Sequence, residues 1–74
     1  MCKKNIIGSR VRKLRKEAKI TQVDLVARLQ VLGIKIDQAG LSKLEGGNRP
    51  VTDIEIAAIA EILKVPISRL FEEN

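Results

Sequence analysis

Residues 37–47 have the types and spacing of a short helix that offers hydrogen bonds on one face. Asp37 is a good N-cap because its carboxylate accepts from free N–H groups of the first turn, and Gly46–Gly47 allows the left-handed conformation that ends a helix. Leu41 and Leu44 share a face that can anchor the helix to a core. The outward face is short and polar and consists of Gln38, Ala39, Ser42 and Lys43. Such a helix fits a DNA major groove, although a solvated helix of a small bundle has the same pattern.

The sequence gives no support for enzymatic catalysis, because the chain has no histidine, the commonest general base. Cys2 is the single cysteine, so it forms no internal disulfide and joins no cluster of metal ligands. Asp24, Asp37 and Glu45 are explained more simply as cap and surface residues. Gly46–Gly47 lacks the preceding strand and the following Gly-Lys-Ser/Thr of a phosphate-binding loop. The sequence therefore predicts no enzyme, no catalytic residue, no metal or other cofactor and no small-molecule substrate.

Length and composition indicate one globular domain. The chain has 74 residues, 45% of them apolar, which supports a single modest core. Phe71 is the one aromatic residue, so this core must be aliphatic. No apolar run approaches the roughly 18 residues of a membrane span, and the residues after Lys3 lack the apolar run of a signal peptide. We expect one domain over residues 1–74, with a flexible basic tail at 1–5, in a cytoplasmic protein that does not contact a membrane.

Apolar periodicity predicts that helices position the polar face. The predicted helices cover residues 6–19, 22–32, 37–45, 53–63 and 67–71. Thr21 caps the second helix, Thr52 or Asp53 caps the fourth, and Gly33 ends the second. The link Ile34–Lys35–Ile36 should tuck its isoleucines against the bundle. The positions predicted to face inward are Ile7, Val11, Leu14, Ala18, Leu25, Val26, Leu29, Leu32, Leu41, Leu44, Ile56, Ile59, Ala60, Leu63, Leu70 and Phe71.

Positive charge is concentrated before residue 50. Residues 1–49 hold 12 Lys and Arg against 4 Asp and Glu, whereas residues 50–74 hold 2 against 5. This asymmetry suggests one side that faces a polyanion, although charge runs are often only solvated faces. The basic side chains of the first predicted helix either contact phosphates or only keep the protein soluble. They are Arg10, Arg12, Lys13, Arg15, Lys16 and Lys19. No aromatic residue is interleaved, so stacking on single strands is not expected.

The order and spacing of these motifs resemble the helix-turn-helix domain of the lambda Cro and cI repressor type, also called the XRE type. The matching segments are residues 7–15, 21–25, 41–47, 59–65 and 70–71, so the resemblance spans residues 6–71. It implies an all-α bundle of five helices, of which the second and third form the DNA-binding unit. Two departures stand out. In the first, Gln30 replaces the usual turn glycine and the stretch from Leu29 to Leu41 is longer than in the common pattern; we interpret the added length as an extra helical turn plus a lengthened connection. In the second, Val26 replaces a small alanine.

The resemblance also implies roles for individual side chains. The residues implied to contact DNA bases are Gln38, Ala39, Ser42 and Lys43, and those implied to contact phosphates are Arg10, Gln22, Asn48 and Arg49. Gln38 is the best base reader because a glutamine amide pairs bidentately with adenine, and Gln22 would brace it. Few direct base contacts are available, so DNA shape should add to specificity.

The predicted function is sequence-specific binding of double-stranded DNA by a transcriptional regulator, most simply a repressor. One reading helix covers few bases, so a homodimer on a palindromic site is expected. The predicted dimer surface belongs to the acidic C-terminal part. It uses Ile54, Ala58 and Ile62, which fall off the inward stripe of the fourth helix, or Phe71 of the last helix. Two alternatives keep the same fold: a protein-interaction module that does not read DNA, and an antitoxin-type protein that binds both DNA and a protein partner.

Overall fold

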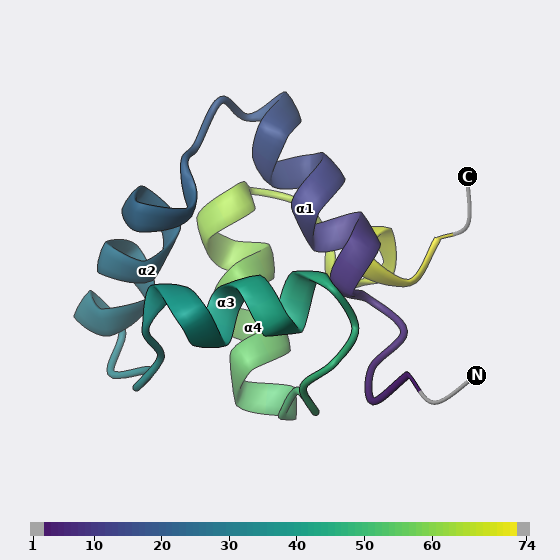
Figure 1. Cartoon of the computed structure of the whole chain (residues 1–74). Coiled ribbons are helices and arrows are strands. Elements are labelled where there is room, and N and C mark those ends of the chain that lie inside the picture. Colours follow the sequence, from purple (N-terminus) through teal and green to yellow (C-terminus); the bar gives the residue numbers. More distant parts are fainter. Residues whose placement is uncertain (1–2, 73–74) are drawn as a thin grey trace.

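A computed structural model describes residues 3–72, which form four α-helices and one 3-10 helix around an aliphatic core (Figure 1). The elements are α1 (Gly8–Glu17), α2 (Gln22–Val31), α3 (Gln38–Glu45), α4 (Asp53–Leu63) and the 3-10 helix η1 (Ile67–Phe71). No strand occurs within residues 3–72. The all-α prediction is therefore confirmed, and the last predicted helix is a 3-10 helix.

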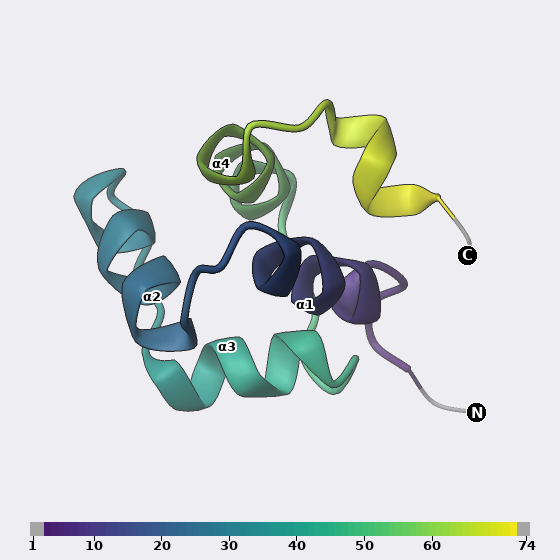
Figure 2. The same ribbon diagram turned by 90° about the horizontal axis from the view of Figure 1, so that it is seen from above.

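The helices are arranged so that one side of α3 stays uncovered. α3 packs against α1 and α2, while α4 packs against α1, α2 and η1. Figure 2 shows α3 and α4 on opposite sides of α1. The outer face of α3 therefore forms one edge of the molecule, and η1 lies on the other side of α1.

Side-chain caps fix where the helices begin. Thr21 Oγ1 accepts from the N–H three residues later at 3.1 Å, and Asp37 Oδ1 does the same at 2.7 Å, which confirms both predicted N-caps. Thr52 caps α4 in a reciprocal capping box with Glu55, whose Oε1 accepts from the Thr52 N–H at 3.0 Å. Asn5 Oδ1 accepts from the first N–H of α1 at 2.8 Å. The start of each α-helix is therefore specified by residues next to it in sequence.

The core is aliphatic, as the single aromatic residue predicted. The connection between α2 and α3 contributes Ile34 and Ile36 to it, while Lys35 between them is exposed, which confirms the prediction for this link. The buried apolar residues are Ile7, Val11, Leu14, Ile20, Leu25, Leu29, Ile34, Ile36, Leu41, Leu44, Ala58, Ile59, Ala60, Leu63 and Leu70.

Four apolar side chains differ from the predicted faces. Ala18 and Leu32 are exposed rather than buried, because α1 ends at Glu17 and α2 at Val31, so both residues lie just past a helix end. Phe71 is 46% exposed, since the tighter 3-10 turn of η1 buries Leu70 instead. Ala58 is only 8% exposed. α4 packs against three neighbours, so a wider arc of its surface is covered than a single stripe predicts.

The connection from α2 to α3 carries the extra length of this chain. α2 continues only two residues past Leu29, which is less than the extra turn that was predicted. Gly33 then adopts φ +86°, and Gln30 Nε2 donates to the Ile36 carbonyl oxygen at 3.1 Å. Val26 is partly buried against the core. The added residues therefore form an ordered connection. The side chain of Gln30, which replaces the turn glycine, holds this connection to α2.

Asn5 corrects the prediction for the N-terminal segment. Its side chain is buried, and Nδ2 donates to the carbonyl oxygens of Leu44 at 3.0 Å and Arg49 at 2.7 Å. The prediction of a flexible tail over residues 1–5 is therefore wrong for Asn5. The prediction for Cys2 lies outside the described residues.

Candidate nucleic-acid interface

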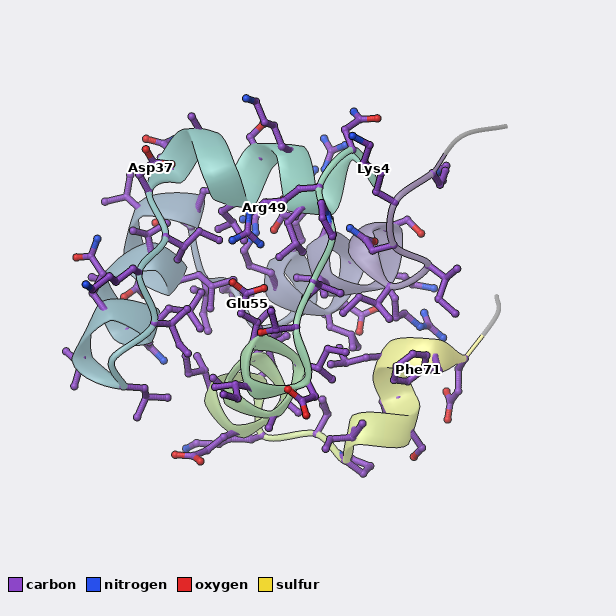
Figure 3. The ribbon with its side chains drawn as sticks, turned by 90° about the horizontal axis from the view of Figure 1, so that it is seen from below. Lys4, Asp37, Arg49, Glu55 and Phe71 are labelled. Atoms are coloured by element: carbon purple, nitrogen blue, oxygen red, sulfur yellow. The ribbon has the colours of Figure 1, made fainter. Side chains whose placement is uncertain are left out.

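The outer face of α3 carries the four side chains that the sequence placed there. Leu41 and Leu44 are completely buried and fix the rotation of the helix about its own axis. The side chains left at the surface are Gln38, Ala39, Ser42 and Lys43. Asp37 marks the N-terminal end of this face at the edge of the molecule (Figure 3). The face therefore offers an amide, a hydroxyl and an ammonium group next to a small methyl group, with no acidic side chain between residues 38 and 44.

A buried ion pair fixes α3 against the other two helices of the interface. Arg15 Nε of α1 donates to Glu45 Oε2 of α3 at 2.7 Å, and its second nitrogen donates to Oε1 at 3.1 Å. Gln22 Nε2 of α2 donates to the same Oε1 at 3.0 Å. The Arg15 and Glu45 side chains are 8% and 3% exposed. One carboxylate therefore joins three helices.

The prediction of surface positions for Arg15 and Glu45 is wrong. Each follows a core leucine and lies four residues after a core residue, Val11 in one case and Leu41 in the other. Residues four apart share a helix face, so this spacing is the sequence signal for burial that was missed. Two buried residues of opposite charge then require each other as partners.

The Gln22 amide also contacts Gln38, the first residue of α3. Its nitrogen must point to the Glu45 carboxylate, which accepts and cannot donate, so its oxygen points outward. This oxygen accepts from Gln38 Nε2 at 3.4 Å, at the long end of the hydrogen-bond range. The brace expected between the two glutamines is therefore present, and the buried charge of Glu45 sets its direction.

A polar hollow beside α3 brings together two of the four implied phosphate ligands, Gln22 and Asn48. Its walls come from α1, from the start of α2 and from the end of α3. It is lined by Arg12, Arg15, Gln22, Ser42, Glu45, Gly46 and Asn48. Arg12 is exposed and was not among the predicted site residues, although its basic character and place on the polar side of α1 point to it. The hollow joins an exposed guanidinium to the first turn of α2, where free N–H groups favour anions.

Arg10 is not brought to this hollow. Its side chain is 10% exposed, and one guanidinium nitrogen lies 3.7 Å from Glu72 Oε1, just past η1. Because η1 lies across α1 from α3, this contact places Arg10 away from the outer face of α3 (Figure 2). Its implied phosphate contact stays a prediction that this placement does not favour.

Arg49 is held against α4 rather than extended in front of α3. Its two terminal nitrogens donate to the two Glu55 oxygens at 3.1 and 2.9 Å, and Figure 3 shows the two side chains facing each other. This hydrogen-bonded pairing raises the pKa of Arg49. It also holds the pKa of Glu55 below its usual value, with a further contribution from the Thr52 N–H, against the opposing effect of burial. A phosphate contact by Arg49 would have to compete with Glu55.

The predicted dimer residues do not form one uniform surface. Ile54 is 67% and Phe71 46% exposed, whereas Ile62 is partly buried against the core. Ala58 belongs to the core of its own chain and has little surface to offer a partner. The candidate dimer surface is therefore reduced to Ile54, Ile62 and Phe71.

Comparison with known proteins agrees with this geometry. A family model described as a helix-turn-helix domain matches residues 6–70, from the residues before α1 into η1. A comparison with curated proteins finds no significant match. In residues 3–72 no helix combines the length and the apolar character that crossing a membrane requires. Because the match covers most of the chain, the protein belongs to the helix-turn-helix domain family, a family of DNA-binding domains.

Proposed function

We propose that this protein binds double-stranded DNA at specific sequences, with α3 in the major groove, and represses transcription. The proposal rests on the outer face of α3, which exposes Gln38, Ser42 and Lys43 while Leu41 and Leu44 are completely buried. An α-helix fits the major groove, where an amide can pair with adenine and an ammonium group with guanine. Gln38 is the main base reader, and Ala39 permits close approach and can contact a thymine methyl group.

Phosphate contacts around the polar hollow orient the protein on the duplex. Gln22 and Asn48 face this hollow together with Arg12, so these three side chains are the leading phosphate ligands. Arg49 and Arg10 are weaker candidates because each is engaged by an acidic side chain. Contacts of this kind position the protein without carrying sequence information.

A homodimer on a palindromic site is the proposed working form, since one α3 reads few base pairs. Ile54, Ile62 and Phe71 are the candidate contacts. Sedimentation with duplex DNA at high micromolar protein should show two chains per site. A strictly monomeric complex under these conditions would refute the dimer and leave DNA binding by single chains.

A second candidate function has one observation in its favour. An apolar groove lies between the C-terminal ends of α2 and α4, and its lining is Arg28, Val31, Leu32, Glu61, Ile62 and Lys64. Val31 is 85% and Leu32 44% exposed. Such a surface suits a protein partner, as in an interaction module or an antitoxin-type protein. α4 lies across α1 from α3, so partner binding there need not exclude DNA binding (Figure 2).

Selection from a random pool of duplex DNA, followed by binding at two salt concentrations, tests the proposal. A palindromic motif with steep salt dependence is the expected result. Arg12→Ala should weaken binding to all sequences alike, whereas Gln38→Ala should relax the preference at one position. Salt-dependent binding without any enriched motif would refute sequence-specific reading by α3. Absence of DNA binding would favour the interaction module.

A further inference from the structure

The segment before α1 is fastened to the end of α3, although it precedes the residues matched by the helix-turn-helix family. Asn5 is 8% exposed and donates from one amide nitrogen to the carbonyl oxygens of Leu44 and Arg49. The Lys4 N–H donates to the Gly47 carbonyl oxygen at 2.8 Å. Three hydrogen bonds thus tie two consecutive residues to α3 and to the loop that follows it.

This attachment places two lysines beside the C-terminal end of the outer face of α3. Lys3 and Lys4 are both exposed, and Figure 3 shows Lys4 next to the end of α3. The aliphatic stem of Lys3 lies over Gly47, where an added Cβ would come within 3.1 Å of Lys3 Cδ. Lys43 is exposed in the last turn of α3, and its carbonyl oxygen accepts from the Asn48 N–H at 2.8 Å in the same loop. The positive surface of the interface therefore continues past the end of α3.

We propose that Lys3 and Lys4 form a fixed basic extension that contacts the DNA backbone beside the C-terminal end of α3. The inference rests on the proposed DNA binding and adds a phosphate contact that the matched family residues do not include. Lysine ammonium groups neutralise phosphates as point charges and release counterions. Because Asn5 already orders the backbone in the free protein, the contact loses less conformational entropy than a free tail would.

The test uses the full chain and a random-sequence duplex, because backbone contacts do not depend on sequence. The double variant Lys3→Gln with Lys4→Gln is compared with the unmodified chain at about 50 and 200 mM salt. Each phosphate contact contributes about 0.9 to the slope of log affinity against log salt. Raising the salt concentration fourfold weakens the binding of both proteins. The factor by which affinity falls should be about 12 times smaller for the double variant than for the unmodified chain.

Lys64→Gln is the matched control, since Lys64 is an exposed lysine at the end of α4, on the far side of α1 from α3. It removes a similar charge and should leave the slope unchanged. Asn5→Ala keeps both lysines but removes the hydrogen bonds of its side chain, and it should weaken binding without changing net charge. Thermal melting monitors folding of every variant.

Two results would overturn the inference. In the first, the unmodified chain binds but its salt slope equals that of the double variant. In the second, Lys64→Gln lowers the salt slope as much per removed charge as the double variant does. The position of the lysines would then have no effect, and only the net charge of the protein would set the slope. A chain without any affinity for duplex DNA would instead refute the proposed function, and with it this inference.

Discussion

Replacing Glu45 by glutamine should strongly destabilise the fold, because it leaves a buried guanidinium without its counter-charge. The carboxylate accepts two hydrogen bonds from Arg15 and one from Gln22, over 2.7 to 3.1 Å. Glutamine keeps the shape of the side chain, but one of its two terminal groups donates instead of accepting. The variant therefore removes the charge and at least one hydrogen bond while the volume of the core stays the same.

The expected loss is about 3–5 kcal/mol in the free energy of unfolding, which is typical when one partner of a buried pair is removed. The 3% exposure of the Glu45 side chain and the 8% exposure of Arg15 place the pair in this class. For a domain of this size the melting temperature should fall by about 10–40 °C. Because the same carboxylate joins α1, α2 and α3, DNA binding should weaken wherever the variant remains folded.

Urea unfolding followed by circular dichroism measures this loss. The matched control is Asp24→Asn, which makes the same chemical change in an exposed pair with Arg28, where the side chains are 43% and 49% exposed. The control should cost less than about 1 kcal/mol, because solvent already screens such a pair. The reasoning would be refuted if the two substitutions destabilised the protein equally. It would also fail if Glu45→Gln lowered stability by less than about 1 kcal/mol.

Three further predictions use other parts of the chain. Gln38→Ala should reduce affinity for the selected DNA site by about 1–3 kcal/mol and affinity for random DNA far less, which competition binding measures. Hydrogen bonding from Arg49 holds the pKa of Glu55 below its usual 4.5, so ionised Glu55 stabilises the fold above that pH and the contribution is lost as pH falls through the lowered pKa. Glu55→Gln should therefore be less stable than the unmodified chain near neutral pH, and urea titrations should show the difference shrinking in acid. An equal difference at every pH would contradict this assignment. Gly8→Ala should destabilise by about 1–3 kcal/mol in urea unfolding, because its Cβ would collide with the Leu44 carbonyl oxygen, which belongs to the backbone and cannot rotate away. A neutral effect would mean that α1 can move away from α3.

The sequence was sufficient wherever the determining interactions are local. The N-caps at Thr21 and Asp37 satisfy N–H groups only three residues away, so the starts of α2 and α3 follow from neighbouring residue types. The spacing of Leu41 and Leu44 fixes which side of α3 is buried, and therefore which side is exposed. The exposed face of α3 was predicted correctly because helical periodicity alone sets which residues are exposed.

Local pattern was less informative where several helices meet. Ala58 lies off the stripe expected for α4, yet it is buried because α4 packs against α1, α2 and η1 at once. Phe71 lies at the surface because the 3-10 turn buries its neighbour. A hydrophobic stripe predicts which side of a helix is buried. The number of neighbouring helices and the angles at which they pack decide how wide an arc of its surface they cover.

The partners of the charged residues were decided by the tertiary structure. Arg15 and Glu45 are 30 residues apart in sequence, and nothing local distinguishes Arg15 from its exposed basic neighbours except its distance from Val11. Asn5 meets the end of α3 across 39 residues. The sequence by itself determined the helices, the exposed face of α3 and the excess of positive charge. The packing of α1, α2 and α4 decided which basic side chains are held in ion pairs and which are left to contact DNA in the proposed complex. An ion pair forms only where folding brings distant side chains within a few ångströms.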